Sequence, residues 1–436
     1  MAQFRTDLHK IDSGQVFTRY EVNMMSDRLS PSGTLTDAFG RLRISQPLTL
    51  FDSTHRFADN GLWATSNTAG NSSYSFSNNQ SLITMTVGTT ENAEVIRETT
   101  KVFSYQPGKS LLMMSTFAME TPKANVRQRV GYYGAENGIY FENDGSTNYF
   151  VLRTNTSGTI VETKVAQTDW NVDKFDSSGY SAQSGGAEHT GGLEVDKTNI
   201  LWMDIEWLGV GDVRCGFVVD GKMLPAHIFH NDNLNIVPYM TTATLPLRYE
   251  IKNTGVTASN STLKQICSTV ISEGGYELYG TQQAIQTPVD TPIDLTSAGT
   301  YYNLISLRLK TDRLDAIAVL TAISLLGITN NAIYNWQVRA NATTTGGTWV
   351  SAGTNSAIEY KIDSATVSGG RVLASGFTTS TTQSSVPVDI LREALFKFQL
   401  ERNGLTGTPY EITLCAASQT SGADIYASMD WEEITR

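Results

Sequence analysis

The segment from Ile200 to Ile251 constrains the fold of this chain more than any other stretch of the sequence. Polar and apolar residues alternate through MDIEW (203–207), which is the period of a strand with two different faces. The dipeptide Asp220-Gly221 is a strong hairpin signal, because the tightest hairpin turn needs positive φ at both of its central residues. We therefore predict an antiparallel meander in the middle of a β-sandwich, with strands at 200–207, 213–219, 223–229 and 245–251.

The composition is typical of a chain built from many short strands. Charged residues make up 17% of the 436 residues, and Gly, Ser, Thr and Asn are abundant. A chain of this length exceeds one ordinary core, so we expect at least two domains. We predict an all-β protein with an N-terminal arm, a concanavalin- or jelly-roll-like β-sandwich, a linker rich in proline and polar residues, and a C-terminal β-sandwich, at 1–46, 47–285, 286–300 and 301–436 respectively.

The charge balance and the apolar pattern limit the partners of this chain. The formal net charge is −11 and the isoelectric point is about 5.0, which argues against binding to nucleic acid or to an anionic membrane. No apolar stretch approaches the length of a membrane span. The cysteines, Cys215, Cys267 and Cys415, are far apart and odd in number, so we predict free thiols in a protein assembled in a reducing cytoplasm.

One constellation has the residue types of a catalytic site. Trp202, Asp204 and Glu206 occupy every second position, so we expect their side chains on one face of a strand. The pattern resembles the Glu-x-Asp-x-Glu strand of the laminarinase-like glycoside hydrolases, in which the first Glu is the nucleophile and the last is the acid/base. In this chain Trp202 stands at the nucleophile position and cannot attack. We therefore predict no catalytic residue here, and an acidic patch on the open face of a sheet is the simpler interpretation.

No metal or cofactor site is predicted. His227 and His230 are three residues apart, so on a strand they would point to opposite faces and could not share one ion. The chain has neither a Gly-x-Ser-x-Gly elbow nor a nucleotide-binding glycine pattern before a helix. The tryptophans could line a carbohydrate surface, but their wide spacing favours core positions or inter-subunit anchors for most of Trp63, Trp170, Trp202, Trp207, Trp336, Trp349 and Trp431.

Several motifs together resemble a family of virion structural proteins of tailed phages, known chiefly from marine and cyanobacterial viruses. The motifs are TDAFGRLRISQPLTLFDS (36–53), RETTKVFSYQPGKSLLMMSTF (97–117), EWLGVGDVRCGFVVDGKMLPAHIFHNDN (206–233) and YMTTATLPLRYEI (239–251). The resemblance implies a component of the head, neck, tail or baseplate of a virion, assembled in the host cytoplasm. It implies no catalytic residue, so we expect a structural protein that performs no reaction and acts through contacts with other virion proteins.

The N-terminal residues suggest how such contacts form. Residues 1–46 are too polar and irregular to make a core, so we expect them to gain order on a neighbouring subunit or another virion protein. Arg41 and Arg43 are candidates for inter-subunit ion pairs, with Phe39 and Phe51 as apolar anchors. Pairing of the two arginines with acidic residues of the same chain is the alternative. We expect a homo-oligomer, with a trimer favoured.

The alternative function is recognition or degradation of a host surface glycan by a virion protein. This function requires that Trp202 be exposed beside Asp204 and Glu206 in an open groove.

Overall fold

The computed structural model describes residues 46–68, 70–176, 192–380 and 398–435. Contacts divide the chain into residues 1–47 and a compact unit of residues 48–436. Within the described ranges the elements are strands, apart from one 3-10 turn at Gln167–Asp169, so the prediction of an all-β fold is confirmed. No helix in this part of the chain is long and apolar enough to cross a membrane.

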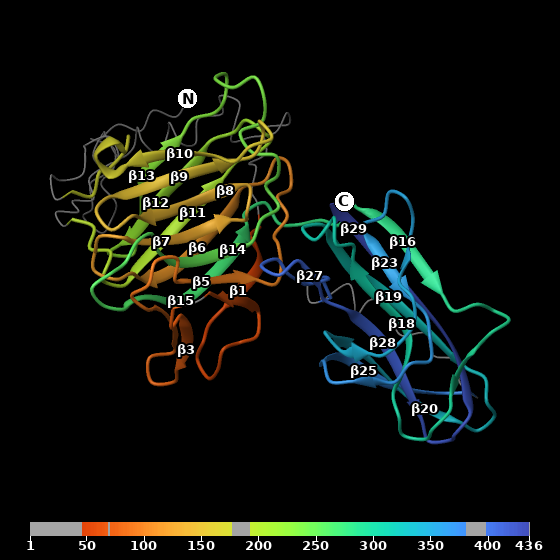
Figure 1. The fold of residues 1–436 in the computed structure, drawn as a ribbon. Coiled ribbons are helices and arrows are strands. Elements are labelled where there is room, and N and C mark those ends of the chain that lie inside the picture. Colours follow the sequence, from red (N-terminus) through yellow and green to blue (C-terminus); the bar gives the residue numbers. More distant parts are fainter. Residues whose placement is uncertain (1–45, 69, 177–191, 381–397, 436) are drawn as a thin grey trace, which may run out of the picture. The chain divides into compact units, whose positions relative to one another are not determined.

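The first sandwich consists of two antiparallel sheets (Figure 1). One sheet has the order β13-β12-β11-β6-β15-β4-β3, with β1 paired to β15. Its strands are β1 (Leu48–Ser53), β3 (Ser73–Ser77), β4 (Leu82–Val87), β6 (Leu111–Ala118), β11 (Asn199–Ile205), β12 (Val213–Val219), β13 (Lys222–Phe229) and β15 (Ser261–Ser272). The other sheet has the order β10-β9-β8-β7-β14-β5-β2. Its strands are β2 (Trp63–Asn67), β5 (Glu94–Thr99), β7 (Val126–Tyr133), β8 (Gly138–Asn143), β9 (Asn148–Thr154), β10 (Val161–Ala166) and β14 (Leu247–Asn253).

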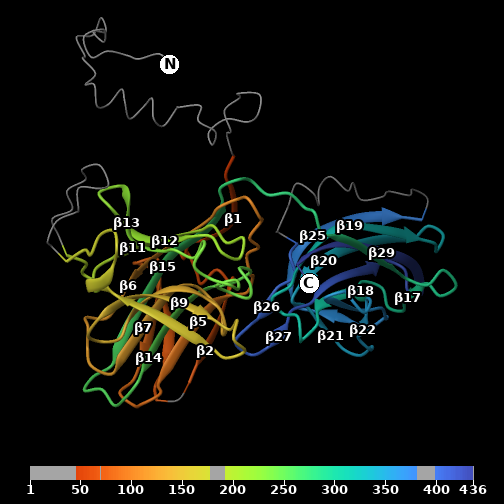
Figure 2. The ribbon, with the colours of Figure 1, turned by 90° about the horizontal axis from the view of Figure 1, so that it is seen from above.

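The core of this sandwich lies between the two sheets, which form two layers in Figure 2. Alternation along β11 decides which residues enter it: Leu201, Met203 and Ile205 are core residues, while Trp202 and Asp204 lie on the opposite face. Aromatic rings fill the space at one end of the core, where the ring centroids of Phe150 and Trp170 are 4.7 Å apart. The described cysteines, Cys215, Cys267 and Cys415, are free, as predicted.

The predicted meander is correct for three of its four strands. β11, β12 and β13 pair in sequence, and Asp220 and Gly221 in their hairpin have φ of 48° and 74°. The fourth strand, β14, is not part of this meander, because it lies between β7 and β5 in the other sheet. The prediction is also wrong about position, since β13 forms the edge of its sheet. The segment between β13 and β14 is long enough to cross from one layer to the other.

The second sandwich also has two main sheets. One has the order β16-β29-β17, with β19 also paired to β29, and the other has the order β22-β23-β18-β28-β20-β25. The strands of the first are β16 (Thr281–Gln286), β17 (Ile293–Leu295), β19 (Ile317–Gly327) and β29 (Ala423–Thr435). Those of the second are β18 (Tyr302–Leu309), β20 (Ile333–Ala340), β22 (Val350–Ser351), β23 (Ile358–Lys361), β25 (Arg371–Thr379) and β28 (Ile412–Ser418). Two short pairs join β21 (Thr343–Thr344) to β24 (Val367–Ser368), and β26 (Arg402–Asn403) to β27 (Thr408–Pro409).

The segment predicted as a linker, 286–300, contains part of this second sandwich. Ile293 and Leu295 are buried on either side of the exposed Asp294, and β17 pairs with β29. The alternation of three residues directly after Pro292 was too short to be recognised as a strand. The position of so short a strand in a sheet depends on its pairing partner more than on its own sequence.

Candidate functional site

Trp202 does not line a groove. Its side chain is 5% exposed, and its indole Nε1 donates a hydrogen bond to the carbonyl oxygen of Phe217 at 3.2 Å. The requirement that Trp202 be exposed for glycan recognition is therefore not met. Asp204 on the same face is also buried; it pairs with Arg214 Nη2 at 2.6 Å and accepts a hydrogen bond from the hydroxyl of Ser110.

Glu206 is separated from these two residues. β11 ends at Ile205, and Glu206 is exposed in the turn that follows, where its backbone N–H donates to the carbonyl oxygen of Asp212 at 3.1 Å. Asp204 is held by a neighbouring cation, so the structure does not offer the two carboxyl groups as an acid and a base.

Three of the four predicted contact residues, Phe39, Arg41 and Arg43, lie outside the described part of the chain. Phe51 is 6% exposed, and its ring packs against those of Trp63 and Phe103 in the core of its own subunit.

A group of paired charges lies on the outer face of the sheet that contains β7. We call it the charged lattice, and Arg129 is at its centre. Arg129 Nε is 2.5 Å from Glu142 Oε2, and Arg129 Nη1 is 3.6 Å from Glu250 Oε1. Glu162 accepts hydrogen bonds from Arg153 Nη2 at 2.6 Å and from the Tyr140 hydroxyl at 2.8 Å. The members of the charged lattice are Arg129, Tyr140, Glu142, Arg153, Glu162, Arg248 and Glu250.

The charged lattice is a structural feature rather than an open site. Arg129, Glu142 and Glu250 are each no more than 4% exposed, and each has a partner of opposite charge. Burial alone would raise the pKa of Glu250, but the guanidinium groups around it lower that pKa overall. Gly131 pairs with Tyr140 of β8, and a Cβ atom there would be 2.5 Å from the carbonyl oxygen of Ile139, so the pairing of these two strands requires glycine at this position. The charges of Arg129, Glu142 and Glu250 are therefore paired within the chain.

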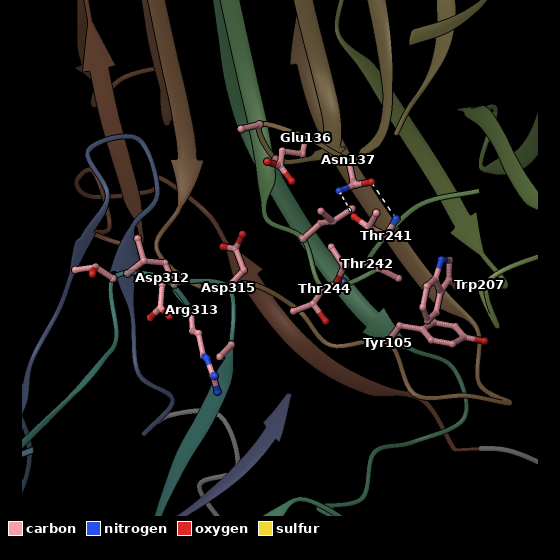
Figure 3. A pocket seen from close by; sticks show the side chains of 17 residues that line it. Tyr105, Glu136, Asn137, Trp207, Thr241, Thr242, Thr244, Asp312, Arg313 and Asp315 are labelled. Carbon is pink, nitrogen blue, oxygen red and sulfur yellow. Dashed lines mark hydrogen bonds between the residues drawn. The ribbon is translucent and has the colours of Figure 1, made fainter. Parts of the chain in front are cut away.

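A pocket of about 680 Å³ lies beside the first sandwich (Figure 3). Its size is in the range of ligand sites, which is roughly 300–1,000 Å³. Five chain segments supply its wall: the β5–β6 connection, the β7–β8 turn, the turn after β11, the segment before β14 and the β18–β19 turn. The lining residues used below are Tyr105, Glu136, Asn137, Trp207, Thr241, Thr242, Thr244, Asp312, Arg313 and Asp315.

Two aromatic rings form one end of this pocket. The centroids of Tyr105 and Trp207 are 6.0 Å apart and the rings are inclined by 78° (Figure 3). Trp207 is held by the turn that follows β11, because its carbonyl oxygen accepts hydrogen bonds from the backbone N–H groups of Val210 and Gly211, both at 2.8 Å. Tyr105 is buried, and burial raises the pKa of its hydroxyl. The rings therefore present a fixed apolar surface.

Hydroxyl and amide groups line the middle of the pocket. The buried Asn137 donates from Nδ2 to Thr241 Oγ1 at 2.7 Å and accepts at Oδ1 from the Thr241 backbone N–H at 3.1 Å (Figure 3). This bidentate contact fixes the segment before β14 against the β7–β8 turn. Thr242 accepts at its hydroxyl from the backbone N–H of Thr244 at 2.9 Å. A ligand rich in hydroxyl groups would meet matching donors and acceptors along this wall.

The side opposite the rings is acidic. Asp312 and Asp315 are exposed, and Figure 3 shows them with Arg313 on this side. Arg313 donates from Nη1 to the carbonyl oxygen of Asn355 at 3.1 Å, so part of its donor capacity is already used. Asp315 accepts from Arg402 Nη2 at 2.9 Å. The lining contains the carboxylates of Glu136, Asp312 and Asp315 and the single guanidinium of Arg313.

The sequence analysis did not identify most of the residues that line this pocket. Trp207 was among the tryptophans that could bind carbohydrate, but the sequence did not separate it from the buried ones. The run TTAT (241–244) has no periodicity, and only tertiary structure brings it to Asn137. A cluster of small hydroxyl residues before a strand was the available signal.

The two histidines named in the sequence analysis differ in exposure. His227 is buried and His230 is exposed. Burial lowers the pKa of His227 to about 4, with a smaller contribution from His230, so its imidazole is neutral at pH 7. His230 Nδ1 lies 3.0 Å from Asp212 Oδ2 at the edge of the first sandwich.

Comparisons with known proteins found similarity among solved structures alone. No protein-family model matches the chain, and no curated protein matches its sequence. Among solved structures, the chain is similar to an endo-β-1,4-glucuronan lyase from Trichoderma reesei, with 11% identity, a TM-score of 0.33, and coverage of 51% of this chain and 95% of the lyase. A glycoside hydrolase family 16 endo-glucanase from Bacteroides ovatus has 8% identity and a TM-score of 0.33, covering 51% and 99% of the two chains. Peanut lectin has 9% identity and a TM-score of 0.29, covering 52% and 98%.

These similarities have TM-scores of 0.29 to 0.33, which are too low to assign the chain to any of these fold families. They correct one prediction from the sequence. We expected a chain that performs no reaction, and this expectation is withdrawn, because enzymes are among the solved structures to which the chain is similar. Identities of 8 to 11% assign no activity to it.

Proposed function

We propose that this protein binds a carbohydrate in the pocket formed by Tyr105, Trp207, Asn137 and the 241–244 segment. The observation that carries the proposal is the placement of an aromatic end beside a wall of hydroxyl and amide groups in one cavity of ligand size. A sugar ring has apolar C–H faces and polar hydroxyl edges, so it matches both surfaces at once. Binding sites of this kind join apolar rings with a few fixed polar groups.

The charges of the pocket favour a neutral or amine-bearing sugar. The carboxylates of Glu136, Asp312 and Asp315 outnumber the one guanidinium in the lining, and the whole chain carries a net charge of −11. A uronate or sialate would bring a like charge to this wall, and juxtaposed like charges disfavour a ligand. We therefore expect neutral glycans to bind more tightly than acidic glycans of the same size.

A glycan array followed by calorimetric titration of its best hit tests the proposal. We expect Trp207→Ala to weaken binding at least tenfold, which corresponds to about 1.4 kcal/mol. Trp349→Ala is the matched control, because Trp349 is also a partly buried tryptophan but lies outside the pocket, stacked 4.0 Å from the guanidinium of Arg308.

Two results would count against carbohydrate binding at this site. One is an array without a hit for the wild-type protein. The other is equal loss of affinity in both tryptophan variants, which would indicate a general effect on folding. Analysis of the glycan after incubation shows whether the bound sugar is also cleaved.

We also propose that the protein is a virion component of a tailed phage, in which a glycan-binding pocket would recognise the host surface. The support is the set of motifs at 36–53, 97–117, 206–233 and 239–251. An antibody against the protein, applied to purified particles, tests this. Labelling of particles is the expected result, and absence of the protein from particles would refute it.

A further inference from the structure

We propose that Asp212, His230 and Asp232 form a binding site for a divalent cation. One ligand atom from each of these three side chains lies within 4.8 Å of the others. The residues come from two connections, since Asp212 directly precedes β12, and His230 and Asp232 follow β13. The antiparallel pairing of these strands brings the two connections together, because Val213 at the start of β12 faces Phe229 at the end of β13.

The separations fit ligands of a single ion. Asp212 Oδ2 and His230 Nδ1 are 3.0 Å apart. Two ligands with bonds of about 2.1 Å are about 3.0 Å apart in adjacent octahedral positions and about 3.4 Å apart in tetrahedral positions. His230 and Asp232 are both exposed, so an ion would have access to them from solvent.

The second observation concerns the other oxygen of Asp212. Asp212 Oδ1 is enclosed and has no hydrogen-bond partner among the described residues. A carboxylate oxygen enclosed in this way normally has a partner, because the loss of hydration is costly. The backbone around it is fixed, with the carbonyl oxygen of Asp212 accepting from the Glu206 N–H at 3.1 Å and that of Gly211 accepting from Asn231 Nδ2 at 2.9 Å.

The donor set indicates the class of cation. One imidazole nitrogen and two carboxylate oxygens suit Zn²⁺ or Mn²⁺ better than Ca²⁺, which prefers six to eight oxygen ligands. Three protein ligands leave further coordination positions for water or a ligand. The sequence argument excluded His227 as a partner of His230, and the three-residue cluster joins His230 to two aspartates instead.

The site would also affect the loop that carries Trp207. Asp212 closes the turn of residues 206–212, and Tyr239 from the second connection donates its backbone N–H to the carbonyl oxygen of Gly209 at 2.9 Å. A cation bound by both connections would therefore hold this turn in place. This consequence depends on the proposed glycan pocket, whereas the cation site itself does not.

Calorimetric titration and thermal unfolding of the full chain test the site directly, without any glycan. The protein is treated with EDTA, dialysed, and titrated separately with ZnCl₂, MnCl₂ and CaCl₂. We expect one Zn²⁺ or Mn²⁺ per chain and a rise in melting temperature on binding, with Ca²⁺ weaker. The substitutions Asp232→Asn and His230→Gln should each weaken binding at least tenfold.

The matched control is Asp220→Asn, which removes a carboxylate from the β12–β13 hairpin, outside the three-residue cluster. It should leave the affinity unchanged. The proposal is refuted if the wild-type chain binds neither Zn²⁺ nor Mn²⁺ below about 1 mM. It is also refuted if Asp232→Asn and His230→Gln bind as the wild type does. Both substituted residues are exposed, so circular dichroism should show unchanged folding.

Discussion

The charged lattice and the pocket are both rich in polar groups, yet they differ in how these groups are satisfied. In the charged lattice, Arg129 and Glu142 are almost fully buried and pair with each other. In the pocket, Asp312 and Thr241 are exposed, and their side chains retain capacity for further hydrogen bonds. Charge density is therefore a poor guide to the site. The hydrogen-bonding capacity that side chains retain after pairing within the protein is a better guide to the binding site.

The comparison predicts that substitutions in the charged lattice affect stability and those in the pocket affect binding. The largest effect is expected for Arg129→Met. Removal of one member of a buried ion pair costs about 3–5 kcal/mol, because the partner charge remains buried. Glu142 and Glu250 would lose their shared cation, although Lys164 and Arg127 still pair with them. The free energy of unfolding in urea is the measurement.

Lys197→Met is the control for Arg129→Met. Lys197 pairs with Asp196 at 3.9 Å and is 68% exposed. An exposed pair of this kind contributes about 0–1 kcal/mol. Equal losses in the two variants would show that the burial of the charged lattice does not determine its contribution.

A smaller effect is expected from acidification. Burial alone would raise the pKa of Glu162, but the guanidinium groups of Arg129 and Arg153 lower it from 4.5 to about 2. A folded-state pKa below the unfolded value gives stability that is present above pH 4.5 and is lost as the pH falls towards 2. We expect Glu162→Gln to lose less stability than the wild type between pH 5 and pH 2. Parallel curves of unfolding free energy against pH would contradict this.

The smallest effect on stability is expected in the pocket. Asp312→Asn changes an exposed side chain, so the free energy of unfolding should change by no more than about 0.5 kcal/mol. The same substitution should raise the affinity for an acidic glycan relative to a neutral one, by a factor that falls at high salt. If Asp312→Asn lowered the free energy of unfolding and left the preference between acidic and neutral glycans unchanged, the pocket would contribute to stability and not to binding.

The sequence predicted those parts of the fold that depend on local patterns. The alternation around Met203 and the positive-φ turn at Asp220-Gly221 are both present. The sheet that receives β14 was not predicted, because Leu247, Tyr249 and Ile251 would bury equally well in either layer. Strand order depends on distant partners, which no local pattern records.

The candidate site was harder to predict for a similar reason. Trp202 and Trp207 are five positions apart in one motif, and the sequence favoured Trp202 because Asp204 follows it. In the structure Trp202 is covered, whereas Trp207 lies in a turn beside Tyr105. The exposure of each tryptophan side chain depends on which other parts of the chain cover it. The residues that complete the pocket, Asn137 and Thr241, are 104 positions apart.

The pairing of β29 has a consequence for the order in which the protein can fold during synthesis. All strands of the first sandwich have been translated once β15 ends at Ser272, so its sheets can assemble while the ribosome is still translating the rest. In the second sandwich, β16, β17 and β19 all pair with β29, which begins at Ala423. Their edges stay unpaired until then, and unpaired apolar strands are prone to aggregate. A nascent chain therefore contains every strand of the first sandwich before it contains the strand on which three strands of the second depend.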